Sequence, residues 1–97
     1  MRRVLLSPRA EADIVDIAAH TLANWGERQM ARYVGGLDHR LGVLAAHPES
    51  GRRRTEIGSD YRSAVYGSHV IFYRVRTADI LVVRVLHARM NPDRHLP

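Results

Sequence analysis

The sequence predicts a small α+β domain in which a helical hairpin packs on one face of a mainly antiparallel sheet, in the order β-α-α-β-β-β. Residues 61–91 carry Val, Ile, Phe and Tyr at the density of strands, with two breaks suited to tight turns. Apolar residues between positions 8 and 46 recur at helical spacing on both sides of Gly26. A three-stranded meander cannot cover its own apolar face, so we expect the helices to pack on it.

Length and composition favour one globular domain spanning residues 1–97. The chain is 45% hydrophobic and 26% charged, which is typical of a folded protein with a single core. It has no cysteine, so neither a disulfide nor a thiolate metal site can stabilise it. The first residues lack the apolar core of a signal peptide, and no later run is long enough to span a bilayer. We therefore expect a cytoplasmic protein without a membrane segment.

The charge is strongly positive and is carried by one residue type. The net charge is +5, the pI is about 10.7, and all 15 basic residues are arginine. Residues 49–97 contain nine arginines against five acids, a net charge of +4, so the sheet half of the chain is the basic half. Arginine suits bidentate binding of carboxylates and phosphates, which favours an acidic partner. The alternative explanation of the same count is a coding bias towards arginine.

The first strand and the first helix follow from local signals. Residues 2–6 form a short apolar strand that Ser7 and Pro8 stop. Ser7 is a good N-cap and Pro8 a good first helical residue, while Gly26 is the expected C-terminal cap. The helix between them has one apolar stripe and a polar face that carries Asp13, and the stripe consists of Ile14, Ile17, Ala18, Leu22 and Trp25. We interpret Trp25 as a packing residue at the corner.

A second helix is predicted from about residue 27 to residue 46. Its apolar residues are spaced four, three, four and three apart, which is the pattern of a packing seam, and they are Met30, Val34, Leu37, Leu41 and Leu44. The pattern lasts about two heptads, so it indicates core packing rather than a coiled-coil dimer. With one glycine between them, the two helices should form an antiparallel hairpin.

Two segments lack a periodic pattern. Residues 48–60 are predicted to be the one long loop, and the consecutive arginines 52–54 within it are either a solvated charge run or a weak phosphate-binding signal. Residues 88–97 are either a frayed end or a short arm laid across the sheet. No nucleotide-binding glycine motif and no close pairing of histidines is present, so we expect neither a cofactor nor a metal site.

The pairing of the three strands brings polar residues onto one face. A three-residue loop before the last strand would set Tyr73 opposite Val83 and His69 opposite His87, and a two-residue turn at positions 67–68 would set Arg62 opposite Tyr73. Arg62, His69, Tyr73 and His87 would then share one face, at the end away from the last turn. Such a group is either an acid/base site for RNA cleavage or a polar interaction surface.

Most of the chain resembles a known family. The matching segments are LSPRAEADIVDI, NWGERQMARYVGGL, HPESG, YRSAVYGSHVIFYRV and VVRVLHARMNPDRHL. In this order they are similar to the ParE toxins of the RelE/ParE superfamily, and the last segment is the most specific. The resemblance implies the toxin of a bacterial type II toxin-antitoxin system that poisons DNA gyrase. It also implies a hetero-oligomer with a ParD-like antitoxin that neutralises the toxin.

The rival within the superfamily is the RelE-like, ribosome-dependent mRNA endonuclease. Those toxins resemble this chain in fold and place basic residues where Arg62 and Arg89 stand here, and His87 or His95 would have to replace a tyrosine of their tail. They usually carry further basic residues before the first meander strand, whereas residues 57–60 are not basic. This departure favours the gyrase-directed function, for which we expect no catalytic residue. If the chain is a nuclease instead, the expected catalytic residues are Arg62, His87, Arg89 and His95.

These arguments give two sets of site residues. We expect the antitoxin to contact exposed apolar positions beside the helix seam and cations of the sheet, namely Tyr33, Leu37, Arg62, Arg74 and Arg84. We expect the C-terminal segment to recognise the target through Arg89, Met90, Arg94 and His95. The alternative for this segment is that Met90 and Leu96 cap an open edge of the core. Sequence-specific binding of nucleic acid by the chain alone is not expected.

Overall fold

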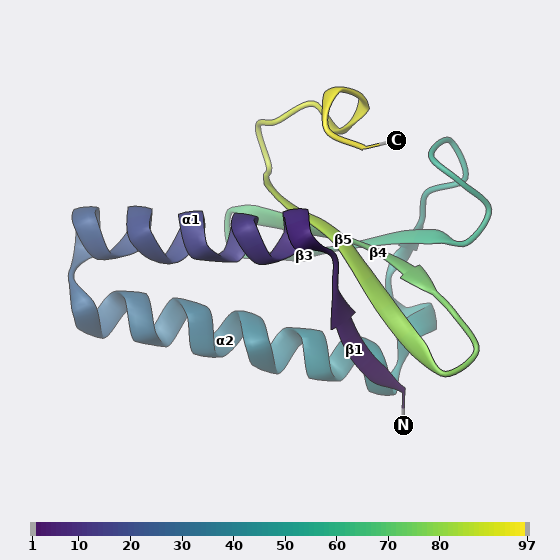
Figure 1. Ribbon diagram of the computed structural model, residues 1–97, viewed down its shortest axis with the longest axis horizontal. Helices are drawn as coiled ribbons and strands as arrows, with labels where there is room; N and C mark the ends of the chain where they lie inside the picture. Colours follow the sequence, from purple (N-terminus) through teal and green to yellow (C-terminus); the bar gives the residue numbers. More distant parts are fainter. Residues whose placement is uncertain (1, 97) are drawn as a thin grey trace.

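The computed structural model describes residues 2–96 and has the predicted order of elements with one addition (Figure 1). The elements are β1 (Arg3–Leu6), α1 (Pro8–Trp25), α2 (Glu27–Ala46), a 3-10 turn (Pro48–Ser50), β2 (Arg52–Arg53), β3 (Tyr61–Tyr66), β4 (His69–Val75), β5 (Asp79–His87) and a second 3-10 turn (Pro92–Arg94). The strands form one sheet in the order β1-β5-β4-β3-β2, in which only the β1–β5 pair is parallel. The predicted α+β fold is therefore confirmed.

The addition is β2, which lies inside the segment that the sequence predicts to be a loop. Its two residues pair antiparallel with β3, Arg52 with Ser63 and Arg53 with Arg62. Both arginines are exposed, so the strand carries no apolar alternation. It is defined by its backbone pairing with β3, which a hydrophobic pattern could not reveal. The prediction of one uninterrupted loop is wrong at this point.

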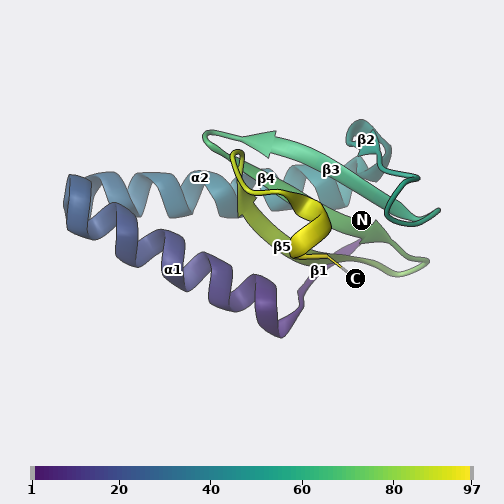
Figure 2. The same cartoon turned by 90° about the horizontal axis from the view of Figure 1, so that it is seen from above.

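The two helices cover one face of the sheet and build the core on it (Figures 1 and 2). The side chain of Ser7 accepts a hydrogen bond from the amide of Ala10, as a helix N-cap should. Gly26 has a φ of 88°, and it joins the helices at a sharp corner. The core contains Ile17 of α1, Leu37, Leu41 and Leu44 of α2, and Ile71, Tyr73, Ile80, Val82 and Val85 of the sheet.

The end of the hairpin departs from the predicted apolar stripe. Leu22 and Trp25 are exposed, Trp25 by 73% of its surface. Figure 1 shows the reason, because both helices extend past the sheet at this end, so that no strand among residues 2–96 covers the last turns of α1. The interpretation of Trp25 as a packing residue is therefore wrong.

A β-bulge in β5 corrects one predicted pairing. Arg62 lies opposite Tyr73 and His69 opposite His87, as the loop lengths predict, but Tyr73 pairs with Val82 instead of Val83. Val83 is the extra residue, and its carbonyl accepts a hydrogen bond from the Ser7 hydroxyl at 2.7 Å. The bulge shifts the in-and-out alternation of side chains along β5 by one residue. Val82 before it and Val85 after it can therefore both face the core.

The opposite face of the sheet is covered by a loop residue and by the C-terminal arm, which we define as residues 88–96. Phe72 and Leu86 point to this face and are 3% and 1% exposed. The Arg54 guanidinium stacks on the Phe72 ring, 5.1 Å from its centroid. Met90 and Pro92 of the arm line a small cavity beside the same ring. The arm is therefore laid over the sheet, which corresponds to the second of the two predicted alternatives.

Candidate functional site between α1, β5 and the C-terminal arm

The arm leaves β5 through a tight turn and then runs back over the sheet (Figure 2). The amide of Met90 donates to the carbonyl of His87, and the amide of Arg89 donates to His87 Nδ1 at 3.1 Å. The Asn91 side chain caps the 3-10 turn of the arm by accepting from the amide of Asp93. Arg89, Met90 and Arg94 are exposed, whereas His95 and Leu96 are half-buried.

Arg84 connects the arm to the body of the protein. Its Nε and Nη2 atoms donate to the two carboxylate oxygens of Asp13 at 2.8 and 2.9 Å, and its Nη1 atom donates to the His95 carbonyl at 3.1 Å. The amide of Val85 donates to the same carboxylate at 2.9 Å. The Arg84 and Asp13 side chains are only 12% and 13% exposed, and the hydrogen bonds to Asp13 raise the pKa of Arg84. Arg84 and Asp13 therefore form a strong bidentate ion pair that is largely shielded from solvent.

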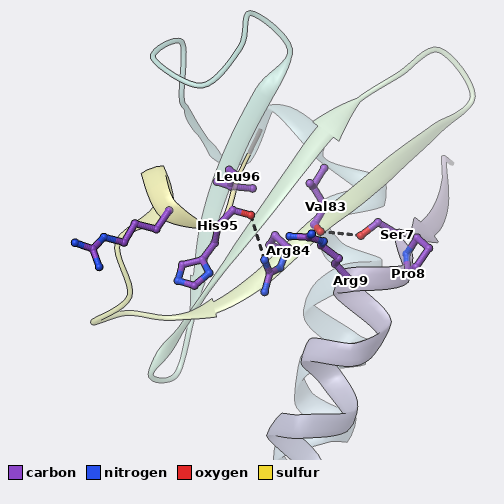
Figure 3. Close-up of a pocket in the computed structure, with 8 residues that line it drawn as sticks. Ser7, Pro8, Arg9, Val83, Arg84, His95 and Leu96 are labelled. Carbon is purple, nitrogen blue, oxygen red and sulfur yellow. Dashed lines mark hydrogen bonds between the residues drawn. The ribbon is translucent and has the colours of Figure 1, made fainter.

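A cavity of about 610 Å³ lies on the α1 side of Arg84 (Figure 3). It is bounded by the start of α1, by β5 and by the end of the arm. Its lining is apolar at Pro8, Val83 and Leu96, and the other residues around it are Ser7, Arg9, Arg84, Arg94 and His95. The cavity separates the end of the arm from the first turn of α1, so the arm is not packed tightly against the helix.

A second cavity, of about 350 Å³, lies between α1 and the other end of β4 and β5. His20, His69 and His87 line it from three elements, together with Met90 of the arm. The rings of His69 and His87 meet edge to face with centroids 5.5 Å apart, and His69 Nδ1 lies 2.7 Å from the Tyr33 hydroxyl. Burial, followed by the charges of His87 and His20, lowers the pKa of His69. A lowered pKa favours the neutral imidazole, and its Nδ1 atom and the Tyr66 carbonyl both lie within hydrogen-bond distance of the Tyr33 hydroxyl.

The structure divides the four polar residues that the strand register groups on one face. Arg62, His69, Tyr73 and His87 do share a face, but four residues along β4 separate Tyr73 from His69, about 13 Å at the usual rise per strand residue. Arg62 donates to the carbonyls of Glu49 and Gly51, and the Tyr73 hydroxyl donates to Pro48. The expectation of one cluster at one end of the sheet is wrong. Arg62 and Tyr73 lie at the other end from His69 and His87, where they hold the loop after α2.

The five candidate antitoxin contacts lie in different surroundings. Leu37 is 1% exposed and belongs to the core, so the expectation that it is a surface residue is wrong. Tyr33 is half-buried, and it exchanges hydrogen bonds with Tyr66, each hydroxyl donating to the other residue's carbonyl. Arg74 forms an ion pair with Asp60, with both side chains more than a third exposed. Arg62 and Arg84 make the internal contacts given above.

Asp13 is the site residue that sequence reasoning misses. It lies on the predicted polar face of α1, where the sequence indicates solvent, yet it is half-buried and takes three hydrogen bonds from β5. Its partners lie 71 and 72 residues further along the chain. No local pattern around Asp13 signals them.

Two further findings concern residues 2–96. These residues contain no group of three or more His, Cys, Asp or Glu side chains positioned to hold a metal ion. Neither helix in this range is long and apolar enough to cross a membrane.

Comparisons with known proteins agree with the resemblance seen in the sequence. Residues 4–92 match the family model described as the ParE toxin of the type II toxin-antitoxin system parDE. The chain is 45% identical over 95 residues to Toxin ParE1 of Mycobacterium tuberculosis, covering 97% of each chain. It is 38% identical over 96 residues to Toxin ParE1 of Caulobacter vibrioides, covering 99% of each, and 33% identical over 92 residues to Toxin ParE of Escherichia coli, covering 94% of this chain and 89% of the relative.

A solved structure gives the same fold. The chain superposes on a structure titled chromosomal ParDE TA system from P. aeruginosa with a TM-score of 0.74, at 18% sequence identity, covering 90% of this chain and 96% of that one. At this identity the likeness bears on the fold, which matches the two helices on a five-stranded sheet. The family model and the relatives extend over nearly the whole chain. The chain therefore belongs to the ParE toxin family of parDE type II toxin-antitoxin systems.

Proposed function

We propose that this chain acts as a gyrase poison, which binds DNA gyrase and holds it in a cleaved complex with DNA. Such a poison needs no acid/base group of its own. The observation that supports binding over catalysis is the separation of the nuclease candidates. Arg62 is held by two loop carbonyls beside α2, whereas His87 and Arg89 lie at the far end of the sheet and His95 lies on the arm. A phosphoryl-transfer site needs its groups within reach of one phosphate.

The exposed arm is the proposed target-binding surface. Arg89, Met90 and Arg94 are exposed on it, and His95 lies half-buried beside them. Met90 is one of only a few large apolar side chains on the described surface that are more than a third exposed. A surface that combines an apolar anchor with arginines is typical of a protein interface. Because gyrase acts on bacterial chromosomal DNA, we expect the toxin to work in the cytoplasm.

A ParD-like antitoxin is the second proposed partner, in a hetero-oligomer. Val15 and Leu22 are exposed and lie seven residues apart on α1, hence on one helix face, and the exposed Trp25 adjoins them. Exposed apolar side chains aligned on a helix suit an amphipathic segment that folds on binding. The partly exposed Tyr33 and Arg74 are further proposed contacts, and the net charge of +5 favours an acidic segment.

The test measures DNA and RNA products with the same purified chain. We expect it to inhibit supercoiling by gyrase with accumulation of cleaved DNA, to leave mRNA intact in a purified translation system, and to lose inhibition when the antitoxin is added. Arg62→Ala and His87→Ala should weaken inhibition only as far as each disturbs binding or folding. Ribosome-dependent mRNA cleavage that either substitution abolishes at unchanged stability would overturn the proposal in favour of the endonuclease.

A further inference from the structure

The end of the arm is attached to the rest of the protein through very few polar contacts. Among residues 2–96, the amides of Arg94, His95 and Leu96 bond only within the arm, to Asn91 and Pro92. Within the described residues 2–96, the bond from Arg84 to the His95 carbonyl is the one hydrogen bond that joins residues 91–96 to the rest of the chain. The remaining attachments lie at the start of the arm, where the amide of Ala88 donates to the Ser68 carbonyl and those of Arg89 and Met90 donate to His87. The end of the arm is therefore held through Arg84.

Packing alone does not fix the position of the arm. The cavity of about 610 Å³ lies between its end and α1, and a smaller one of about 180 Å³ lies between its start and the Phe72 side of the sheet. Figure 3 shows His95 and Leu96 on one side of the larger cavity and Ser7 and Pro8 on the other. An arm that borders one cavity at its start and another at its end has room to move unless a directional bond holds it.

The guanidinium of Arg84 can supply that bond because its own orientation is fixed. Two of its nitrogens are held by the two oxygens of Asp13, so the plane of the group is set and the third nitrogen points to the His95 carbonyl. Asp13 is fixed in turn by the amide of Val85, two residues after the bulge residue Val83. A lysine could make one of these contacts, but it has no planar fork with which to make them all.

We propose that the Asp13–Arg84 pair is a positioning device that sets the conformation of the C-terminal arm for target recognition. This inference rests on the proposed function, because it gives the arm the role of a contact with gyrase. Neither side chain needs to touch the target. Asp13, on α1, would thus control the activity of a surface on another element. The bond from Arg84 to the arm does not depend on the side chain at position 95, because its acceptor is the backbone carbonyl of that residue.

The decisive variant is Arg84→Lys, with Arg76→Lys as its matched control. Arg76 is also an arginine paired with an aspartate, Asp79, but at the opposite end of β5 from the arm. Amide hydrogen exchange should be at least about tenfold faster at His95 and Leu96 in Arg84→Lys, with protection in β4 unchanged. Inhibition of gyrase should fall by at least about tenfold, whereas Arg76→Lys should match the parent chain in both measurements.

Each alternative outcome decides one step of the inference. Unchanged exchange at His95 and Leu96 would overturn the positioning by Arg84. Faster exchange with full inhibition of gyrase would overturn its importance for recognition. If the parent chain fails to inhibit gyrase, the proposed function fails, and the exchange measurement still decides whether Arg84 holds the arm. Should Arg84→Lys not fold, Asp13→Asn keeps an acceptor for the Val85 amide and must loosen the arm in the same way.

Discussion

The contact between Gly51 and Tyr73 gives a stability prediction that the structure specifies closely. Gly51 is buried at φ −76° and ψ 154°, a conformation open to any residue, so it is glycine for lack of space. A Cβ there would overlap the Tyr73 hydroxyl and lie 2.8 Å from its Cζ atom and 3.0 Å from the Ser63 carbonyl. Tyr73 is fully buried, and its hydroxyl bonds to Pro48 at 2.7 Å, so it cannot swing away.

The substitution Gly51→Ala should therefore lower the free energy of unfolding by about 2 kcal/mol. Overpacking costs about 1–3 kcal/mol, and a lower entropy of the unfolded chain returns about 0.5 kcal/mol. Tyr73→Phe should cost about 1.5 kcal/mol, because the buried Pro48 carbonyl loses its donor. The double variant removes the worst overlap and should cost about 2.5 kcal/mol, about 1 kcal/mol less than the sum.

Urea denaturation with a shared slope measures this cycle. Gly35→Ala is the control, because Gly35 is an exposed helical glycine whose added Cβ would meet nothing within 4 Å, and it should stabilise the protein by about 0.5–1 kcal/mol. The steric argument would be refuted if the cost of the double variant equalled the sum of the two single costs within about 0.3 kcal/mol. A Gly51→Ala variant as stable as the parent would refute it as well.

Two further predictions concern the second cavity and the arm. Burial lowers the pKa of His69 below its ordinary 6.5, so its contribution to stability is complete above that pH and is lost as the pH falls through the lowered pKa. The melting temperature should fall on acidification from about pH 7.5 to about pH 5.5, and His69→Gln should reduce that fall; an identical pH profile would assign it to other groups. Truncation after His87 should destabilise the protein by about 2 kcal/mol, because it uncovers Phe72 and Leu86, and unchanged urea unfolding would contradict this. A folded product that binds antitoxin but spares gyrase would support the recognition role of the arm.

The sequence predicts what local chemistry determines. Ser7, Pro8 and Gly26 mark the helix limits because caps act on their own backbone neighbours, and the helices do run from Pro8 to Trp25 and from Glu27 to Ala46. The turn at Gly67, where φ is 56°, sets the β3–β4 register for the same reason.

The parts that sequence reasoning misses depend on partners far away in the chain. The bulge at Val83 and the burial of Asp13 arise where α1 meets β5, more than 70 residues apart. Leu22 and Trp25 follow the same helical period as Ile17, and only the length of the sheet relative to the helices leaves them exposed. The candidate site is likewise only partly predictable. Its arm residues belong to the last sequence segment that resembles the family, whereas the bond from Arg84 that holds the arm depends on the fold.

The parallel pairing of β1 with β5 has a consequence for synthesis. The first strand and its neighbour are distant in sequence, as the 76 residues between Ser7 and Val83 show. A ribosome adding about 5–20 residues per second needs about 4–15 s to make that interval, so Val4, Leu5 and Leu6 must wait that long for their partner strand. The arm is made later still. Every newly made copy therefore passes through an interval in which its helical hairpin can exist but the arm and the strand that carries it do not, so the proposed target-binding surface is the last part of the fold to form.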